Sequence, residues 1–287
     1  MSSELLPLRA LIEAHDLWPK KSLGQHFLLD TNLLAKIVRA AGDITTAHVI
    51  EVGPGPGGLT RAILEAGPKH LTAIEKDARC LAALAQLKEK YPDMLTLLEA
   101  DALRVDITTI AESPRMVIAN LPYNVGTALV LDWVLLAAKL GPSALTGFTV
   151  MLQKEVAERM VANVGDDAYG RLSVIMQQYT DAAILFDVPA SAFTPPPKVT
   201  SAILRARMLE KPREDVPQKI LERVVAAAFN NRRKMLRQSL KSLGVDAIAL
   251  CKAAELNETL RAEQCDLAMF ARLGRALAQM GDKPADI

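Results

Sequence analysis

Short apolar segments alternate with longer amphipathic segments through the first half of the chain, and this alternation limits the possible folds most strongly. Strands are predicted at 48–52, 70–75, 95–99, 116–119 and 147–152. Helical patterns lie at 5–15, 31–41, 58–66, 78–90, 127–140 and 154–164. Strands that alternate with helices usually lie parallel in one sheet, with helices on both of its faces. The sequence therefore predicts an α/β fold with a mostly parallel sheet.

The pattern changes in the second half of the chain. Two further strands, at 183–188 and 199–208, are predicted to extend the sheet with an antiparallel edge. A polar, proline-bearing segment at 211–217 follows and marks a domain boundary. After it the periodicity is only helical, at 217–230, 232–243, 245–254 and 262–280. We therefore expect three parts: an N-terminal extension (1–20), a larger domain (21–210) and a small all-helical domain (211–287).

Charge is distributed unevenly along the 287-residue chain, whose formal net charge is only +1. Between Lys211 and Gly244, nine Lys and Arg residues stand against three Asp and Glu residues, which predicts a basic surface for a polyanion. The three cysteines are far apart, so neither a zinc site nor a disulfide framework is expected. Apolar stretches such as 128–140 are too short to span a bilayer. These features indicate a soluble cytoplasmic protein that binds no metal and no membrane.

A glycine-rich turn follows the strand at 48–52. Gly53, Gly55 and Gly58 have the GxGxxG spacing, and such glycines let the backbone approach a ligand at the start of a helix. Glu75 lies 22 residues after Gly53, at the end of the next strand, where a carboxylate can bind two ribose hydroxyls. The turn predicts a nucleoside cofactor, with contacts from Gly53, Gly55 and Glu75. NAD fits this pattern too, and a turn without any ligand is the simplest alternative.

Two further carboxylates favour S-adenosylmethionine over NAD. Asp101 follows the third strand, where it can accept a hydrogen bond from an adenine amino group, although it also suits the N-cap of a helix from Leu103. Glu51 lies directly before the glycines and can meet the cofactor's ammonium group, a cation that NAD lacks. The expected cofactor is S-adenosyl-L-methionine, and the expected product is S-adenosyl-L-homocysteine.

The segment Asn120-Leu121-Pro122-Tyr123 follows the fourth strand, at the edge of the sheet where ligands bind in such folds. The Asn120 side-chain oxygen and the Leu121 carbonyl can accept both N–H bonds of an exocyclic amino group and favour the pyramidal nitrogen that attacks a methyl group. Tyr123 can stack on the base, and Phe193 is the candidate for a second ring around a flipped-out base. The alternatives are an ordinary strand-to-helix turn and an ordinary core phenylalanine.

A basic segment lies in the predicted helix 232–243, and no Asp or Glu occurs between positions 223 and 244. Helical spacing places three basic residues on one face and apolar residues on another. Charged helix faces are usually only solvated, but the lack of acidic neighbours favours contact with RNA phosphates. The expected RNA-binding residues are Arg232, Arg233, Lys234, Arg237 and Lys241, of which Arg233, Arg237 and Lys241 share the face.

These motifs together resemble a known family, the small-subunit ribosomal RNA adenine N6-dimethyltransferases of the bacterial kasugamycin-sensitivity type. The resemblance runs from Lys21 to about Leu243, and more loosely to the C-terminus. Besides the glycine turn, Glu75 and Asp101, it rests on five motifs in order: Leu23-Gly24-Gln25-His26-Phe27-Leu28, Asn120-Leu121-Pro122-Tyr123-Asn124, Gln153-Lys154-Glu155-Val156-Ala157-Glu158-Arg159, Pro195-Pro196-Pro197-Lys198-Val199 and Phe229-Asn230-Asn231-Arg232-Arg233-Lys234.

The resemblance implies a Rossmann-like class I methyltransferase domain and a small helical domain that binds rRNA. It implies dimethylation of two adjacent adenosines in the 3′-terminal hairpin of small-subunit rRNA, within the pre-30S subunit, by a monomer. By position it assigns cofactor contacts to His26, Leu28, Gly53, Glu75, Asp101 and Asn120, and an acceptor site to Asn120, Leu121 and Tyr123. Two positions depart from the family pattern. His26 replaces a common Asn, so its cofactor contact would come from the backbone or the imidazole, and Gly126 replaces a usual Ser, which would loosen the loop.

Three alternatives stay open. A macrolide-resistance methyltransferase would modify large-subunit rRNA with the same chemistry, although Leu121 and the basic residues 232–234 favour the small-subunit type. A ribosome-assembly or transcription factor would keep the fold without catalysis, although the intact Asn120 segment and Glu75 speak against an inactive site. An NAD-dependent oxidoreductase would share the glycine turn.

Overall fold

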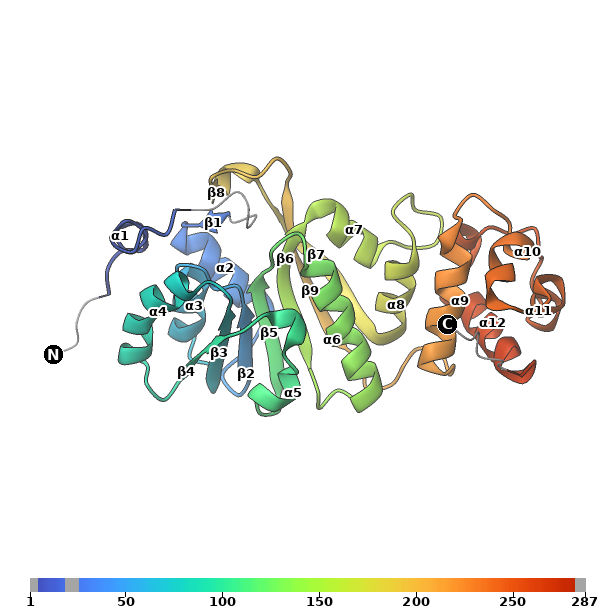
Figure 1. The fold of residues 1–287 in the computed structure, drawn as a ribbon, viewed down its shortest axis with the longest axis horizontal. Helices are drawn as coiled ribbons and strands as arrows, with labels where there is room; N and C mark the ends of the chain where they lie inside the picture. Colours follow the sequence, from blue (N-terminus) through green and yellow to red (C-terminus); the bar gives the residue numbers. More distant parts are fainter. Residues whose placement is uncertain (1–4, 19–25, 282–287) are drawn as a thin grey trace. The chain divides into compact units, whose positions relative to one another are not determined.

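The computed structural model describes residues 5–18 and 26–281, and these contain a sheet with helices on both faces (Figure 1). The strands of the described residues in this sheet are β2 (His48–Val52), β3 (His70–Glu75), β4 (Leu95–Glu99), β5 (Arg115–Asn120), β6 (Gly147–Gln153), β7 (Thr180–Val188) and β9 (Ser201–Met208). Their order is β4-β3-β2-β5-β6-β9-β7. The pairs from β4 to β6 are parallel, and β9 is antiparallel to β6. The predicted α/β fold with a mostly parallel sheet is confirmed.

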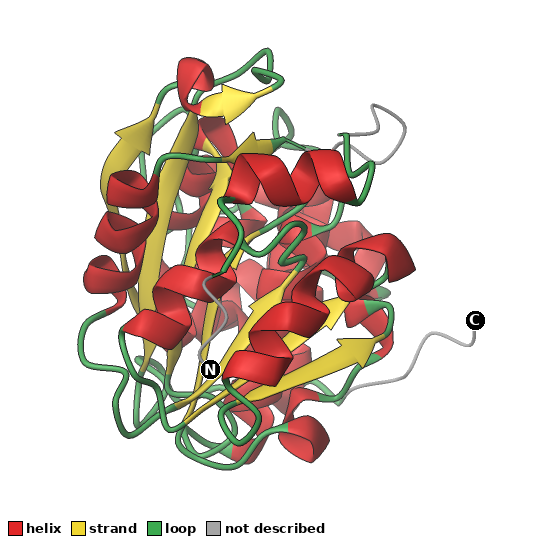
Figure 2. Cartoon of the chain, turned by 90° about the vertical axis from the view of Figure 1, so that its left-hand side faces the viewer, coloured by secondary structure: helices red, strands yellow, loops and turns green. Residues whose placement is uncertain are grey.

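The sheet is apolar because helices cover it on both sides, as Figure 2 shows. Every residue of β2 is buried, as a central strand of a parallel sheet requires. Val49 and Leu71 of the sheet pack in one cluster with Leu34, Ile63 and Leu84 of three different helices. The helices of this part are α1 (Leu8–Ala14), α2 (Thr31–Ala41), α3 (Gly58–Glu65), α4 (Ala78–Lys90), η2 (Ala102–Arg104), α5 (Ile107–Ile110), α6 (Gly126–Leu140) and α7 (Lys154–Val161).

A second, two-stranded sheet lies beside the carboxyl ends of the parallel strands. β1 (Phe27–Leu28) pairs antiparallel with β8 (Phe193–Thr194), so that Leu28 lies opposite Phe193. The sequence predicts neither strand, because two residues are too few to show a period of two. This pairing brings two segments that are far apart in the sequence to the same place.

The chain separates into two compact units, Met1–Ala157 with Ala183–Met208, and Glu158–Ala182 with Leu209–Ile287. The sequence pattern instead places 158–182 in the larger domain and predicts no helix at 171–179. In the structure Tyr169 is buried in one cluster with Leu221 and Phe270, and its hydroxyl donates to the Cys265 carbonyl at 3.0 Å. The helices of the second unit are α8 (Arg171–Tyr179), α9 (Gln218–Asn230), α10 (Leu236–Ser239), η4 (Leu240–Leu243), α11 (Ala247–Ala253), η5 (Ala262–Gln264) and α12 (Leu267–Gln279).

The continuous helix predicted at 232–243 is wrong. α9 ends at Asn230, and the helix resumes only with α10 at Leu236. Between them Lys234 N–H donates to the Asn231 carbonyl at 2.8 Å, which closes a turn, and Leu236 N–H donates to the Leu260 carbonyl at 2.7 Å. The basic residue at 233 therefore does not share a helical face with those at 237 and 241.

Some expectations fall outside what the structure describes. Residues 19–25 are not described, and they include the first part of the motif 23–28. Within 5–18 and 26–281, no helix is long and apolar enough to cross a membrane. In the same ranges no group of three or more His, Cys, Asp or Glu residues could hold a metal ion.

Candidate active site

The glycine turn between β2 and α3 has a backbone that glycine adopts more easily than other residues. Gly53, Gly55 and Gly57 have φ angles of +68°, +54° and +89°. Gly55 N–H donates to Glu75 Oε2 at 3.1 Å. The other carboxylate oxygen, Oε1, accepts from the backbone N–H groups of Lys76 and Asp77 at 2.8 and 2.9 Å. Glu75 thus holds the turn from the end of β3. The third glycine with a positive φ is Gly57, which the GxGxxG pattern does not mark.

Two hollows formed by described residues lie against this turn, and the larger has a volume of about 580 Å³. Glu75 and Asp101 line it, together with Gly53, Gly55 and Lys76. Its volume is in the range of small-molecule pockets, roughly 300–1,000 Å³. Four of the predicted cofactor contacts, Gly53, Gly55, Glu75 and Asp101, therefore line one cavity.

The carboxylate of Asp101 already has two partners in the protein. One oxygen accepts from Leu103 N–H at 3.2 Å and caps η2, and the other lies 3.1 Å from Lys76 Nζ. The hydrogen bond from Lys76, and then the one from Leu103, lower the pKa of Asp101. The capping alternative is therefore observed, and lone pairs remain for a ligand. Lys76 belongs to none of the motifs that the sequence shows.

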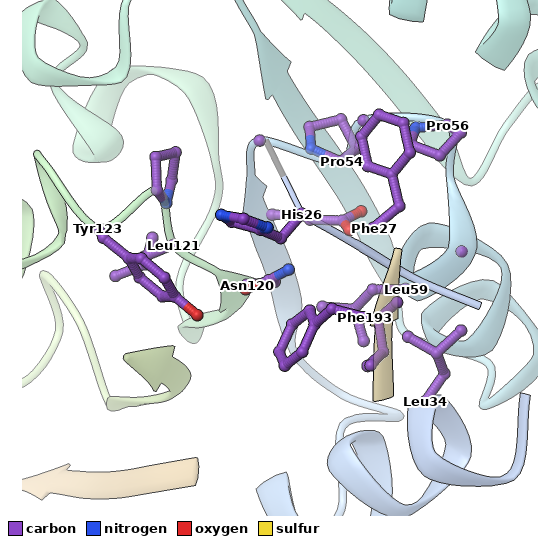
Figure 3. Close-up of a pocket in the computed structure, with 16 residues that line it drawn as sticks. His26, Phe27, Leu34, Pro54, Pro56, Leu59, Asn120, Leu121, Tyr123 and Phe193 are labelled. Atoms are coloured by element: carbon purple, nitrogen blue, oxygen red, sulfur yellow. The ribbon is translucent and has the colours of Figure 1, made fainter. Parts of the chain in front are cut away.

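A smaller hollow, of about 90 Å³, adjoins the larger one, since Gly53, Gly55 and Pro122 line both. It brings together nine predicted site residues: His26, Leu28, Glu51, Gly53, Gly55, Asn120, Leu121, Tyr123 and Phe193. Figure 3 shows Asn120 with Tyr123 and Phe193 to either side of it.

The end of β5 fixes the acceptor segment. Asn120 lies opposite Met151 in the parallel register with β6, and Leu121 N–H donates to the Met151 carbonyl at 3.3 Å. The Leu121 side chain is buried. A Cβ at Gly126 would lie 3.3 Å from Leu121 Cβ and 2.7 Å from Leu152 Cδ2. Gly126 therefore permits a close approach of α6 to the segment, and the looser loop expected at this position stays a prediction.

Tyr123 is held at its hydroxyl and along its ring. The hydroxyl lies 2.7 Å from Ser201 Oγ, and the ring stacks on that of His26 with centroids 6.0 Å apart and planes 29° apart. His26 Nδ1 lies 2.8 Å from the Pro195 carbonyl, and since a carbonyl only accepts, Nδ1 carries a proton. No sequence motif marks Ser201, which comes from β9. Phe193 is 3% exposed, so it belongs both to the core and to the lining of the hollow.

Glu51 is a buried carboxyl group at the bottom of this site. It is 1% exposed, and its Oε2 has no hydrogen-bond partner among the described residues. Burial, helped by the nearby Glu75 carboxylate and opposed by Thr60, raises the pKa of Glu51 to about 8. Buried polar atoms without a partner are uncommon in native proteins and often mark binding sites. A cation in the smaller hollow would satisfy this one.

The predicted RNA-binding residues all lie in the other compact unit and differ in their surroundings. Arg232 is engaged within the protein, with Nε 3.2 Å from Glu263 Oε2 and Nη2 donating to the Asp167 carbonyl at 2.7 Å. Arg233, Lys234 and Lys241 are exposed, and Arg237 is half-buried.

The sheet order, the glycine turn and the two hollows at the strand ends define a Rossmann-like methyltransferase fold. Two solved structures share it. A dimethyladenosine transferase from Plasmodium falciparum is 24% identical and superposes with a TM-score of 0.71, over 90% of this chain and 99% of that one. The 23S rRNA methyltransferase ErmE is also 24% identical, with a TM-score of 0.63, over 88% of this chain and 100% of that one.

Sequence comparison gives the family. The model for "Ribosomal RNA adenine dimethylase" matches residues 18–279. A protein of Cereibacter sphaeroides is 51% identical over 96% of this chain and 98% of its own length, and one of Paracoccus denitrificans is 52% identical over 96% of each. Both are named ribosomal RNA small subunit methyltransferase A. The chain belongs to the ribosomal RNA adenine dimethylase family, as its motifs predict.

Proposed function

We propose that this protein transfers methyl groups from S-adenosyl-L-methionine to N6 of two adjacent adenosines in the 3′-terminal hairpin of small-subunit rRNA. The pre-30S subunit as partner, a monomeric state and a cytoplasmic location are parts of the proposal. The observation that carries it is the smaller hollow, where Glu51, whose Oε2 has no partner among the described residues, and the acceptor residues Asn120 and Leu121 line one space. The names of relatives that are 51 and 52% identical support the choice of subunit.

The residues of the two hollows suit this cofactor. Glu51 offers its oxygen to an ammonium group, while Glu75 and Asp101 in the larger hollow offer carboxylate oxygens to ribose hydroxyls and an adenine amino group. When bound, the cofactor supplies an electrophilic methyl group. The ammonium group also separates it from NAD, which carries no such cation to satisfy Glu51.

The acceptor chemistry follows from the end of β5. The Asn120 side-chain oxygen and the Leu121 carbonyl would accept the two N–H bonds of the adenine amino group and direct its lone pair toward the methyl group. Tyr123 is held by Ser201, so little side-chain entropy would be lost when a base stacks on it. Such stacking contributes about 1–3 kcal/mol per base, which helps to offset the cost of flipping the base out.

Nucleoside mass spectrometry of unmethylated small ribosomal subunits tests the proposal. After incubation with the protein and S-adenosylmethionine, N6,N6-dimethyladenosine is expected in small subunits and not in large subunits treated in the same way. Modification of large subunits only would favour the macrolide-resistance type. No modification of either, with proven cofactor binding, would leave a binding factor without catalysis.

We predict that Asn120→Ala lowers the rate of methylation by at least about 100-fold, because the variant lacks one of the two acceptors for the amino group. The thermal unfolding midpoint should stay close to that of the wild type. Asn163→Ala, at an exposed position in the other unit, is the control and should methylate normally. Near-normal turnover by Asn120→Ala would refute the acceptor role.

A further inference from the structure

A third hollow lies on the second unit and includes no residue of the proposed active site. Its volume is about 550 Å³, and all of its lining residues belong to this unit. Arg171 and Arg223 line it together with Asn230 and Ser242. Its apolar lining consists of Ala226, Ala227, Phe229 and Leu243.

The sequence of α9 creates this hollow. Positions 223, 226, 227 and 230 follow the spacing of one helical face. The two middle positions are alanines, so the face has polar side chains at its ends, Arg223 and Asn230, and little bulk between them. Arg171 is the first residue of α8, which packs beside α9. Ser242 and Leu243 come from η4.

The segment from Arg223 to Gly244, which supplies all of the lining except Arg171, carries charge of one sign. No Asp or Glu occurs between 223 and 244, a segment that carries six Lys and Arg residues. Two guanidinium groups on one hollow suit a phosphate, which they can bind through paired N–H donors. The carboxamide of Asn230 and the hydroxyl of Ser242 can bind a sugar hydroxyl.

The single aromatic residue of the lining indicates which part of a nucleic acid would bind. The ring of Phe229 is partly buried and packs against the core of the unit, 6.0 Å from the ring of Tyr169 and 5.6 Å from that of Phe270 by centroids. A ring that packs against two others offers less surface for stacking a base than a fully exposed ring. The hollow therefore suits the sugar–phosphate backbone better than a base.

We infer that this hollow binds a ribose–phosphate unit of the RNA substrate, with Arg171 and Arg223 at the phosphate and Asn230 and Ser242 at the ribose. The inference rests on the proposed function, since that function makes RNA the partner. It adds a second contact region to the exposed basic turn at 233–234. It also gives the helical unit a shaped site for the RNA backbone in addition to its general positive charge.

Binding of unmethylated small subunits across a salt series tests the inference. The logarithm of the binding constant falls linearly with the logarithm of the salt concentration, and loss of one phosphate contact makes this slope shallower by about 0.7 to 0.9. Arg171→Gln with Arg223→Gln removes the partners of one phosphate, so it should weaken binding and make the slope shallower by about 0.7 to 0.9. The matched control, Lys139→Gln with Lys252→Gln, removes the same charge at exposed positions outside the hollow and should change the slope little.

A second variant distinguishes binding within the hollow from long-range electrostatic attraction. Ala226→Leu keeps both arginines and fills the space between them, so it should also weaken binding, with the thermal midpoint as a check on folding. Equal weakening by the arginine variant and the lysine control, or normal binding by Ala226→Leu, would overturn the inference. Methylation by the wild type is measured in parallel. If the wild type methylates and the arginine variant binds normally, only the hollow is refuted, whereas a wild type that binds RNA without methylating it refutes the proposed function.

Discussion

Glu51 shows how one buried side chain connects protonation to ligand binding. In the folded protein without a cation its carboxyl has a pKa of about 8, against 4.5 for the ordinary group. A raised pKa favours the neutral form in the folded state. The folded state therefore tolerates the neutral Glu51 at low pH without cost. As the pH rises from about 4.5 through about 8, the unfolded chain ionises this group first, and the protein loses stability.

Glu51→Gln should remove this pH dependence and weaken cofactor binding. At pH 7 a carboxyl with a pKa of about 8 is ionised in only about one molecule in ten, so wild-type affinity for S-adenosylmethionine should rise with pH up to about 8. The glutamine cannot ionise, so its affinity should be lower and nearly independent of pH between about 6 and 8.5. Calorimetric titrations at several pH values measure both. If wild type and variant showed the same pH dependence, the ammonium group would not be bound by Glu51.

At the scale of the elements, the glycine turn is fixed by backbone geometry and by packing against α4. Gly57 has a φ of +89°, and a Cβ there would lie 2.5 Å from Leu84 Cδ2 and 3.2 Å from Leu87 Cδ1. Gly67, after α3, has a φ of +69° but open space around it. The two positions share the strain of a left-handed backbone and differ in packing.

Gly57→Ala should therefore destabilise the protein more than Gly67→Ala. Backbone strain alone costs roughly 1–2 kcal/mol, which is the expected effect at Gly67. At Gly57 the crowded helix face adds about 1–3 kcal/mol. Free energies of unfolding from urea titrations check the difference. Equal values would mean that α4 moves away without cost.

Local patterns made most elements predictable, and distant contacts account for the rest. β2, β3 and α4 have the predicted bounds because their apolar periodicity and end signals lie within each segment. The break in the helix at 232–243 depends on the Leu260 carbonyl, which no local pattern reveals. In the site, Glu51 and Asn120 could be placed because they lie at the carboxyl ends of β2 and β5. The contact between Tyr123 and Ser201 could not, because it joins the turn after β5 to β9, which are 78 residues apart in the sequence.

β2 begins with His48, a buried histidine that is neutral at pH 7. His48 Nδ1 accepts from Glu112 N–H at 3.0 Å, so its Nε2–H donates to Thr72 Oγ1 at 2.8 Å. Burial, and then the neighbouring His70, lower the pKa of His48 to about 4. Between about pH 4 and 6.5 the unfolded chain binds a proton here that the folded protein does not, so stability rises with pH in this window.

His48→Gln should make the dependence of stability on pH weaker between about pH 4 and 6.5. A shift from 6.5 to about 4 corresponds to up to about 3 kcal/mol, which the variant no longer loses on acidification. Urea unfolding at several pH values measures the effect. His15→Gln, at an exposed position, is the control and should leave the curve unchanged. Parallel curves for wild type and His48→Gln would contradict the assignment.

At the scale of the whole molecule, the charge that matters for RNA is concentrated in one unit of a nearly neutral protein. The net charge is +1, but the stretch 211–244 has six more basic than acidic residues. Within it, Arg232 is bonded to Glu263 and to the Asp167 carbonyl, whereas Arg233 and Lys234 are exposed. Substitutions of Arg233 and Lys234 should therefore affect RNA binding, whereas substitution of Arg232 should affect stability.

Arg233→Glu with Lys234→Glu should weaken binding to small subunits and make its salt dependence shallower by about 1 to 2 in log–log slope, because two RNA phosphates no longer have a basic partner. Stability and cofactor affinity should stay unchanged. Arg232→Ala should instead lower the free energy of unfolding by about 0.5–1 kcal/mol, since it removes a partly exposed ion pair with Glu263 and a hydrogen bond to the Asp167 carbonyl. Arg39→Glu with Lys139→Glu, which makes the same charge change on exposed helix positions of the other unit, separates a local contact from the effect of net charge. If this control weakened binding as much as the first variant, the basic turn would act only through its charge and would not contact the RNA.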